Sequence, residues 1–104
     1  MVQITLKEQV YNGRLDFRTI ANIQCELRKR GMVVGLQDIF ERIKEQDFNV
    51  ITELVVQSIL RCHPKLKRHM IEDKLDLDEM VNAIEFTQKL VESSITVKTT
   101  EEGK

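Results

Sequence analysis

The sequence predicts a mainly α-helical fold, with a small N-terminal β-hairpin or strand followed by about five short helices packed around a central apolar helix. Strand-type alternation is confined to the first residues of the chain. Apolar residues then recur at three- and four-residue steps, which is the period of amphipathic helices. One segment, 48–62, is apolar on most of its circumference and therefore belongs in the middle of the domain. With 104 residues the chain can build one modest core, and we assign residues 1–94 to a single domain.

The segment 2–15 is expected to form the strand or hairpin. Val2–Leu6 alternates apolar and polar residues, as a half-buried strand does. Asn12-Gly13 is the commonest two-residue hairpin signal, so we place the turn there. A two-stranded hairpin is marginal alone and must pack on the helices.

The first helix is expected at about 17–30 and has a clear start and stop. Asp16 can cap its free N–H groups, and Gly31 can supply a left-handed stop. Positive charge in the last turn, from Arg28, Lys29 and Arg30, suits the negative end of the helix dipole. Its predicted apolar face consists of Phe17, Ile20, Ile23 and Leu27.

Two further helices are expected at about 36–46 and 48–62. Leu36, Ile39, Phe40 and Ile43 mark the first of them, and Asp47 or Asn49 can cap the second. The second carries the apolar side chains of the core: Val50, Ile51, Leu54, Val55, Val56, Ile59 and Leu60. A charge placed in this core should unfold the domain, and a Leu54→Asp protein that is as stable as the parent in thermal melts would contradict the assignment.

The last two helices are expected at about 64–73 and 77–93. Pro64 can open the former, with Leu66, Met70 and Ile71 facing inward. Asp76 and Glu79 have the spacing of a capping box for the latter. Its predicted inward face comprises Met80, Val81, Ile84, Thr87 and Val91, flanked by Ala83, Phe86 and Leu90. Residues 95–104 are expected to be a polar, mobile tail, with an added edge strand as the alternative.

The charge balance excludes a strong general attraction to polyanions. The net charge is −1, although residues 1–30 carry +3 and residues 75–104 carry −4. No signal peptide is evident, and polar residues interrupt the longest apolar stretch, Val50–Leu60, so no membrane association is expected. We expect a cytoplasmic protein in which Cys25 and Cys62 are free, buried thiols.

No catalytic, cofactor or metal site is predicted. Cys62, His63 and His69 lack the paired spacing of zinc ligands, and no third group is evident that could orient a Cys62–His63 nucleophile pair. The four glycines are scattered, so they form no phosphate-binding loop. We therefore expect that the protein is not an enzyme and has no cofactor.

Nucleic-acid binding would rest on two basic clusters, Arg28–Arg30 and Lys65–His69. A helix-turn-helix joining the segments 36–46 and 48–62 is disfavoured, because the second helix is apolar all round and carries Glu53 where a groove-reading face needs basic or amide side chains. No nucleic-acid partner is expected.

The order of elements resembles the tail assembly chaperones of long-tailed bacteriophages and prophages. The resemblance covers about residues 2–92 and includes the helix start Leu15-Asp16-Phe17, the closing Gly31, the amphipathic segment Leu36–Ile43, and the Leu-Asp-Leu-Asp-Glu-Met opening of the last helix at 75–80. One departure from the family pattern is the polar Lys7-Glu8-Gln9 before the expected turn.

The resemblance implies a non-enzymatic role in tail morphogenesis. Such proteins bind the tape measure protein, help to recruit tail tube subunits around it, act in the host cytoplasm and are absent from the mature virion. The alternative is a small helical regulator or adaptor, including a prophage-encoded DNA-binding regulator. The partner-binding surface stays open between the acidic face of the last helix and tail, the basic end of the first helix, and an exposed apolar groove. A homo-oligomer is also open, because a second copy could cover such a groove.

Overall fold

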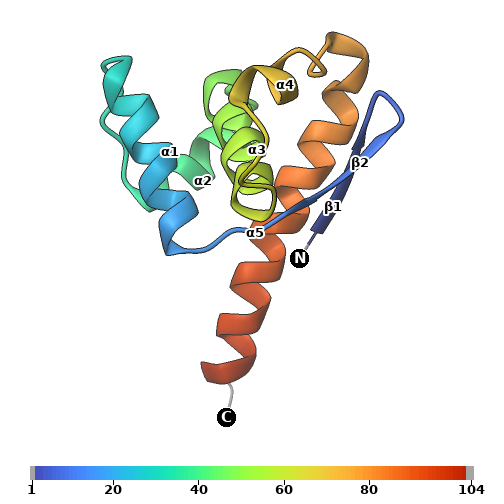
Figure 1. The fold of residues 1–104 in the computed structure, drawn as a ribbon. Coiled ribbons are helices and arrows are strands. Elements are labelled where there is room, and N and C mark those ends of the chain that lie inside the picture. The colour runs from blue at the N-terminus through green and yellow to red at the C-terminus, as the bar shows by residue number, and fades with distance from the viewer. Residues whose placement is uncertain (1, 103–104) are drawn as a thin grey trace.

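The computed structural model describes the backbone of residues 2–102 and the side chains of residues 2–93. It is mainly helical with an N-terminal antiparallel hairpin, as the sequence predicts. The central helix, α3 (Phe48–Cys62), has α1 (Phe17–Lys29) on one side, with the hairpin and α5 (Met80–Glu102) on the other (Figure 1). The elements in chain order are β1 (Val2–Leu6), β2 (Gln9–Gly13), α1 (Phe17–Lys29), α2 (Leu36–Lys44), α3 (Phe48–Cys62), α4 (Arg68–Glu72), the 3₁₀ turn η1 (Leu77–Glu79) and α5 (Met80–Glu102).

The hairpin turn lies at Lys7-Glu8, so its predicted place at Asn12-Gly13 is wrong. Leu6 pairs with Gln9, and both turn residues have positive φ, 49° and 70°. This conformation matches the strand twist even without glycine. A turn at Asn12-Gly13 would leave only two residues for a second strand before the helix cap. The observed register instead places Ile4, Leu6 and Tyr11 in the core.

Gly13 ends β2 at a point of close packing. A Cβ atom added there would lie 2.2 Å from Cζ of Phe86 on α5. Directly after it, the Arg14 N–H donates to the Ser58 carbonyl of α3 at 3.1 Å. Because Gly13 has no side chain, the end of β2 can pack closely against both α5 and α3.

The cap and the stop of α1 are confirmed. The Asp16 side chain accepts from the Thr19 N–H, and Gly31 has φ 83°. Two carbonyls near the end of the helix are satisfied by the chain that follows: Met32 N–H donates to Leu27 O at 2.9 Å and Gly31 N–H to Arg28 O at 3.0 Å. This is the Schellman arrangement.

The predicted apolar face of α1 is wrong at its first member. Phe17 is 94% exposed, whereas Thr19, Ile23 and Leu27 are buried. Residues six apart are separated by about 120° around a helix, so Phe17 points away from the Ile23 face. Thr19 can take the buried place because its hydroxyl is bonded to Asp16 and to the Arg14 carbonyl.

The central helix has the predicted bounds, Phe48–Cys62, and its Asp47 cap is confirmed. Of its seven predicted core side chains, six are buried and Leu60 is partly buried. On α2, Ile39 and Ile43 are buried, but Leu36 is 47% exposed.

The fourth helix is shorter than predicted. Pro64 lies in a turn, closed by a 3.0 Å hydrogen bond from Leu66 N–H to His63 O, and α4 begins only at Arg68. The extended backbone of Lys67 separates the turn from the helix. Ile71 is buried as expected, Leu66 is partly buried, and Met70 is 43% exposed.

The start of the last helix lacks the predicted capping box. Asp76 makes no side-chain cap bond; its carboxylate pairs with Lys7, while its carbonyl accepts from Glu79 N–H at 2.9 Å. The buried face consists of Ala83, Phe86, Thr87 and Leu90, and Val81 is 60% exposed.

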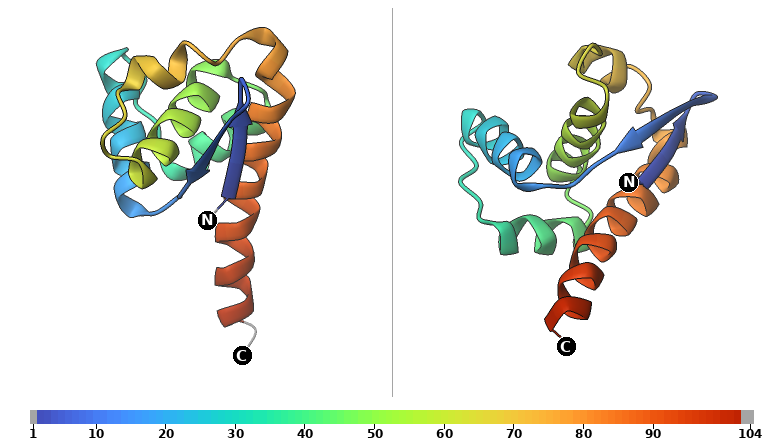
Figure 2. Two further views of the ribbon diagram at one scale, coloured as in Figure 1. Left: turned by 45° about the vertical axis from the view of Figure 1, so that its right-hand side comes forward. Right: turned by 60° about the horizontal axis from the view of Figure 1, so that its bottom comes forward.

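The predicted end of the last helix near residue 93 is also wrong, as is the alternative of an edge strand. Helix α5 continues to Glu102, and its last turns project from the body of the domain (Figures 1 and 2). No proline or glycine occurs between residues 94 and 102, so no residue there breaks the series of helical backbone hydrogen bonds. Residues 103–104 lie outside the described residues, and the mobility of the tail stays a prediction.

Candidate partner-binding cleft

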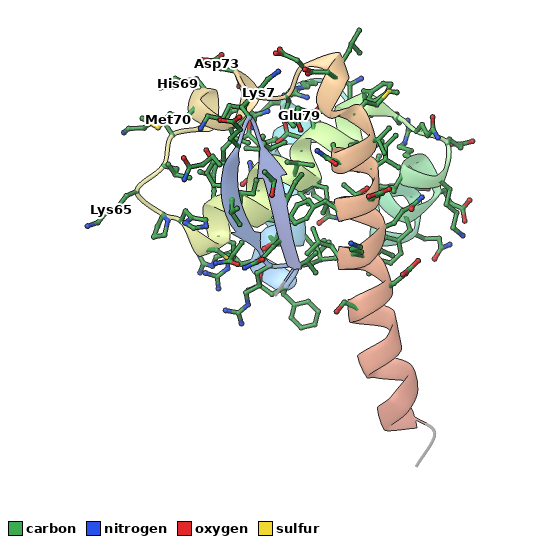
Figure 3. All side chains as sticks on the ribbon, turned by 90° about the vertical axis from the view of Figure 1, so that its right-hand side faces the viewer. Lys7, Lys65, His69, Met70, Asp73 and Glu79 are labelled. Atoms are coloured by element: carbon green, nitrogen blue, oxygen red, sulfur yellow. The ribbon has the colours of Figure 1, made fainter. Side chains whose placement is uncertain are left out.

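His63, one of the two histidines considered as ligands, makes other contacts. His63 Nε2 accepts from the Asn12 N–H at 3.1 Å, and its ring lies nearly perpendicular to that of Tyr11, with the ring centroids 5.9 Å apart. His69 lies on α4, beside Met70 and Asp73 (Figure 3). Among the residues whose side chains are described, no three histidine, cysteine or acidic groups gather where a metal ion could bind.

The expectation of two buried thiols is wrong for Cys25, which is exposed, and Cys62 is partly buried. Cys25 lies two residues from the buried Ile23, and such a step turns about 200° around the helix. Its side chain therefore faces away from the core. The two thiols form no disulfide.

Three of the six lysine and arginine side chains in the two basic clusters are paired with carboxylates of the described residues. Lys29 pairs with Glu26 at 2.8 Å, and Arg30 pairs with Glu53 at 2.7 Å. Arg68 binds Glu53 and also approaches Glu72 at 3.2 Å. These pairs neutralise part of the positive charge that binding to a phosphate backbone would require.

Glu53 is a buried ionic centre that the sequence reasoning missed. Its carboxylate is fully buried in α3 and is bonded by the guanidinium groups of Arg30 and Arg68. The hydrogen bonds to Glu53 are the largest influence that raises the pKa of Arg68. The carboxylate thereby joins the end of α1, the middle of α3 and the start of α4. No periodicity could reveal this, because a lone charge on an apolar helix gives no indication of its partners.

The hairpin tip is pinned to η1 by ionic contacts. Lys7 Nζ lies 3.0 Å from both Asp76 and Asp78, and the Lys7 N–H donates to Glu79 Oε1 at 3.3 Å. The hydrogen bonds to Asp78 and Asp76 raise the pKa of Lys7. Figure 3 shows Lys7 at the hairpin tip with Glu79 nearby. Two carboxylates share the Lys7 ammonium, and the third, Glu79, is bonded only to the Lys7 backbone, so this edge keeps a negative balance.

An apolar cleft lies beside this acidic edge, between the first turns of α3 and α5. It has a volume of about 120 Å³. The residues that line it are Phe48, Ile51, Thr52, Val55, Leu75, Asp76, Leu77, Glu79, Met80 and Ala83. The lining therefore contains two carboxylates and no basic side chain. The α3 contributors follow three- and four-residue steps, so one helix face forms one wall.

Large apolar side chains stay exposed around the cleft. Phe48 is 48% exposed, Leu77 85% and Met80 36%. Exposed apolar groups that gather at a concave site are typical of surfaces that bind another protein. The sequence predicted Met80 as an inward-facing residue, but it could not indicate that Phe48 and Leu77 would meet it there.

A second depression is more polar. It lies between β2 and α4 and is lined by Gln9, Tyr11, Leu66, His69, Met70, Asp73 and Lys74. Lys74 Nζ is held by the Tyr11 hydroxyl at 2.6 Å. Polar groups make up a larger share of its exposed lining, so the cleft between α3 and α5 is the stronger candidate for an apolar partner.

None of the described helices has both the length and the apolar character needed to cross a bilayer. Comparison with known proteins finds no matching family model, curated protein or solved structure.

Proposed function

We propose that this protein is a non-enzymatic tail assembly chaperone, which binds a phage tape measure protein and helps to recruit tail tube subunits in the host cytoplasm. The resemblance in the order of elements suggests the role. The observation that carries it furthest is the cleft between α3 and α5, where Phe48, Leu77 and Met80 are exposed together.

The physical task fits a small domain of this kind. A long chain with a periodic apolar stripe aggregates unless the stripe is covered. A helical domain can cover it by accepting the apolar face of a helix in a groove. Such a chaperone needs only to bind and release, and it is expected to be absent from the finished virion.

Co-expression with the tape measure protein of the same genome tests the proposal. The expected result is that the two proteins co-purify and that the tape measure protein becomes soluble. A tape measure protein that stays insoluble and does not co-purify would contradict the proposed function. Salt-sensitive binding of duplex DNA at micromolar protein would instead support the regulator.

A further inference from the structure

We propose that the cleft between α3 and α5 binds a partner helix through one bulky apolar anchor side chain that is flanked by lysine or arginine. The inference rests on the proposed function, because it takes the partner helix to belong to the tape measure protein. Three properties of the cleft define the occupant: its volume, its walls and its charge.

The volume fits one large side chain. At about 120 Å³ the cleft is somewhat smaller than an apolar cavity of about 150 Å³ that holds benzene. A single leucine or methionine side chain suits this volume, while the partner backbone stays outside. The exposed Phe48, Leu77 and Met80 can then cover the sides of the anchor.

The walls favour a helix over an extended strand. Side chains of α3 and α5 line the cleft, and of these Ile51, Val55 and Ala83 are buried, so the exposed apolar surface comes from Phe48, Leu77 and Met80. A third helix can lie against these exposed side chains and insert one side chain between α3 and α5. An extended peptide would need a free backbone edge for pairing, and helices offer none.

The charge favours a basic helix. Asp76 and Glu79 line the cleft, and Asp78 lies between them in sequence. Among the described side chains, Asp76 and Asp78 share the Lys7 ammonium, while Glu79 accepts only from the Lys7 backbone N–H. A lysine or arginine one helical turn before or after the anchor would reach these carboxylates. Complementary charge of this kind fixes orientation and speeds association.

A second copy of this chain is the competing occupant, because its α4 could supply both the apolar anchor and the flanking basic residues. The anchor would be Met70, which is 43% exposed, and Lys67 and Lys74 lie three residues before and four residues after it. Lys74 is already held by Tyr11, which weakens this alternative.

The test uses a fluorescent Ala-rich helical peptide of about 20 residues, with one leucine and a lysine one turn to each side. Matched peptides carry alanine in place of the leucine, or glutamate in place of the lysines. Fluorescence anisotropy should show that the parent peptide binds the protein about tenfold more tightly than the alanine peptide or the glutamate peptide does. Leu77→Ser and Phe48→Ser should weaken its binding about tenfold, while Val33→Ser, which removes an apolar side chain that is 77% exposed and outside the cleft, should not. Circular dichroism checks that each variant is folded.

Equal binding of all three peptides, no binding of the parent peptide, or full binding by Leu77→Ser would overturn the inference. Co-purification with the tape measure protein is measured separately for Leu77→Ser. If that variant still co-purifies, the chaperone function stands and the cleft is the wrong site. If the unaltered protein fails to co-purify, the proposed function fails, whatever the peptides show. A dimer in sedimentation analysis that Leu77→Ser abolishes would assign the cleft to a second copy and overturn the inference.

Discussion

Gly13 occupies a place where no side chain fits. Its added Cβ would meet Phe86 Cζ at 2.2 Å and Ser58 Oγ at 3.1 Å. We expect Gly13→Ala to lower the free energy of unfolding by about 1–3 kcal/mol, because the well-packed core must shift. Urea titration measures the loss.

Phe86 provides the matched control for Gly13. In the Gly13→Ala protein, Phe86→Leu should cost less than it does in the parent, because the shorter side chain relieves the clash. Purely additive losses in this double-mutant cycle would show that the close approach is not what makes Gly13 necessary.

Glu53 shows what removal of a buried charge partner costs. Glu53→Ala would leave Arg30 and Arg68 converging on a site without an anion. We expect a loss of about 3 kcal/mol in the free energy of unfolding, near the lower end for buried pairs because both arginines keep some solvent contact. Chemical denaturation gives the value.

Glu72→Ala is the control for Glu53, since it removes only the partly exposed partner of the same arginine. It should cost less than about 1 kcal/mol. Equal losses of unfolding free energy in the two variants would mean that the buried carboxylate of Glu53 contributes no more to stability than the partly exposed one of Glu72. The sequence shows Glu53 on the central helix, but its partners are 23 and 15 residues away, so only the folded chain reveals the cluster.

At the scale of elements, two helices end in the same way with different residues. Gly31 has φ 83° after α1, and Gln46 has φ 60° after α2. Asp47 N–H then donates to Arg42 O at 2.9 Å and Gln46 N–H to Ile43 O at 3.0 Å, which repeats the pattern after α1. A side chain at positive φ is strained, and glycine is not.

Relief of about 1–2 kcal/mol of strain exceeds the roughly 0.4–1 kcal/mol that glycine costs by raising the entropy of the unfolded chain. Gln46→Gly should therefore raise the free energy of unfolding by about 0.5–1 kcal/mol. The control is Glu45→Gly, compared in thermal melts. Glu45 has φ −83°, so it carries no strain that glycine could relieve, and this variant should not be stabilised. A Gln46→Gly protein that is less stable than the parent would contradict the argument.

The elements that the sequence predicts well are those with strong local signals. The bounds of α3 follow from its unbroken apolar run and its Asp47 cap. The sequence misplaces the hairpin turn because Asn12-Gly13 is a strong turn signal. In the structure Gly13 serves close packing against α5 instead. The cleft depends on the meeting of Phe48 with Leu77 and Met80, about thirty positions later, and no local pattern reports such a meeting.

At the scale of the whole molecule, carboxylates with lowered pKa values connect stability to pH. Burial raises the pKa of Asp16, but hydrogen bonds from Thr19 and the charges of Arg61 and Arg14 outweigh it, so the net pKa is below the ordinary value of 3.8. The hydrogen bond from Lys29 is the largest cause that lowers the pKa of Glu26 from 4.5. Both groups bind protons less readily in the folded state than in the unfolded state. Their stabilisation is therefore present above pH of about 4.5 and is lost as the pH falls through the folded values.

Thermal melts from pH 6 to pH 3 should show this loss, and Asp16→Asn should reduce its steepness. Glu92→Gln changes the formal charge equally and removes no ion pair that the described side chains form, so it should keep the parent slope. A parent-like slope in Asp16→Asn would contradict the role of that carboxylate.

The pairing of the hairpin with α5 sets an order for events during synthesis. Lys7 meets Asp78 across 71 positions of sequence, and β1 packs along α5, so β1 is synthesised well before the helix that it packs against. At about 5–20 residues per second a ribosome needs several seconds to supply that partner. Throughout that interval Ile4, Leu6 and Tyr11 have no helix α5 to cover them. The nascent chain thus meets the aggregation hazard that we propose the finished protein prevents in its partner.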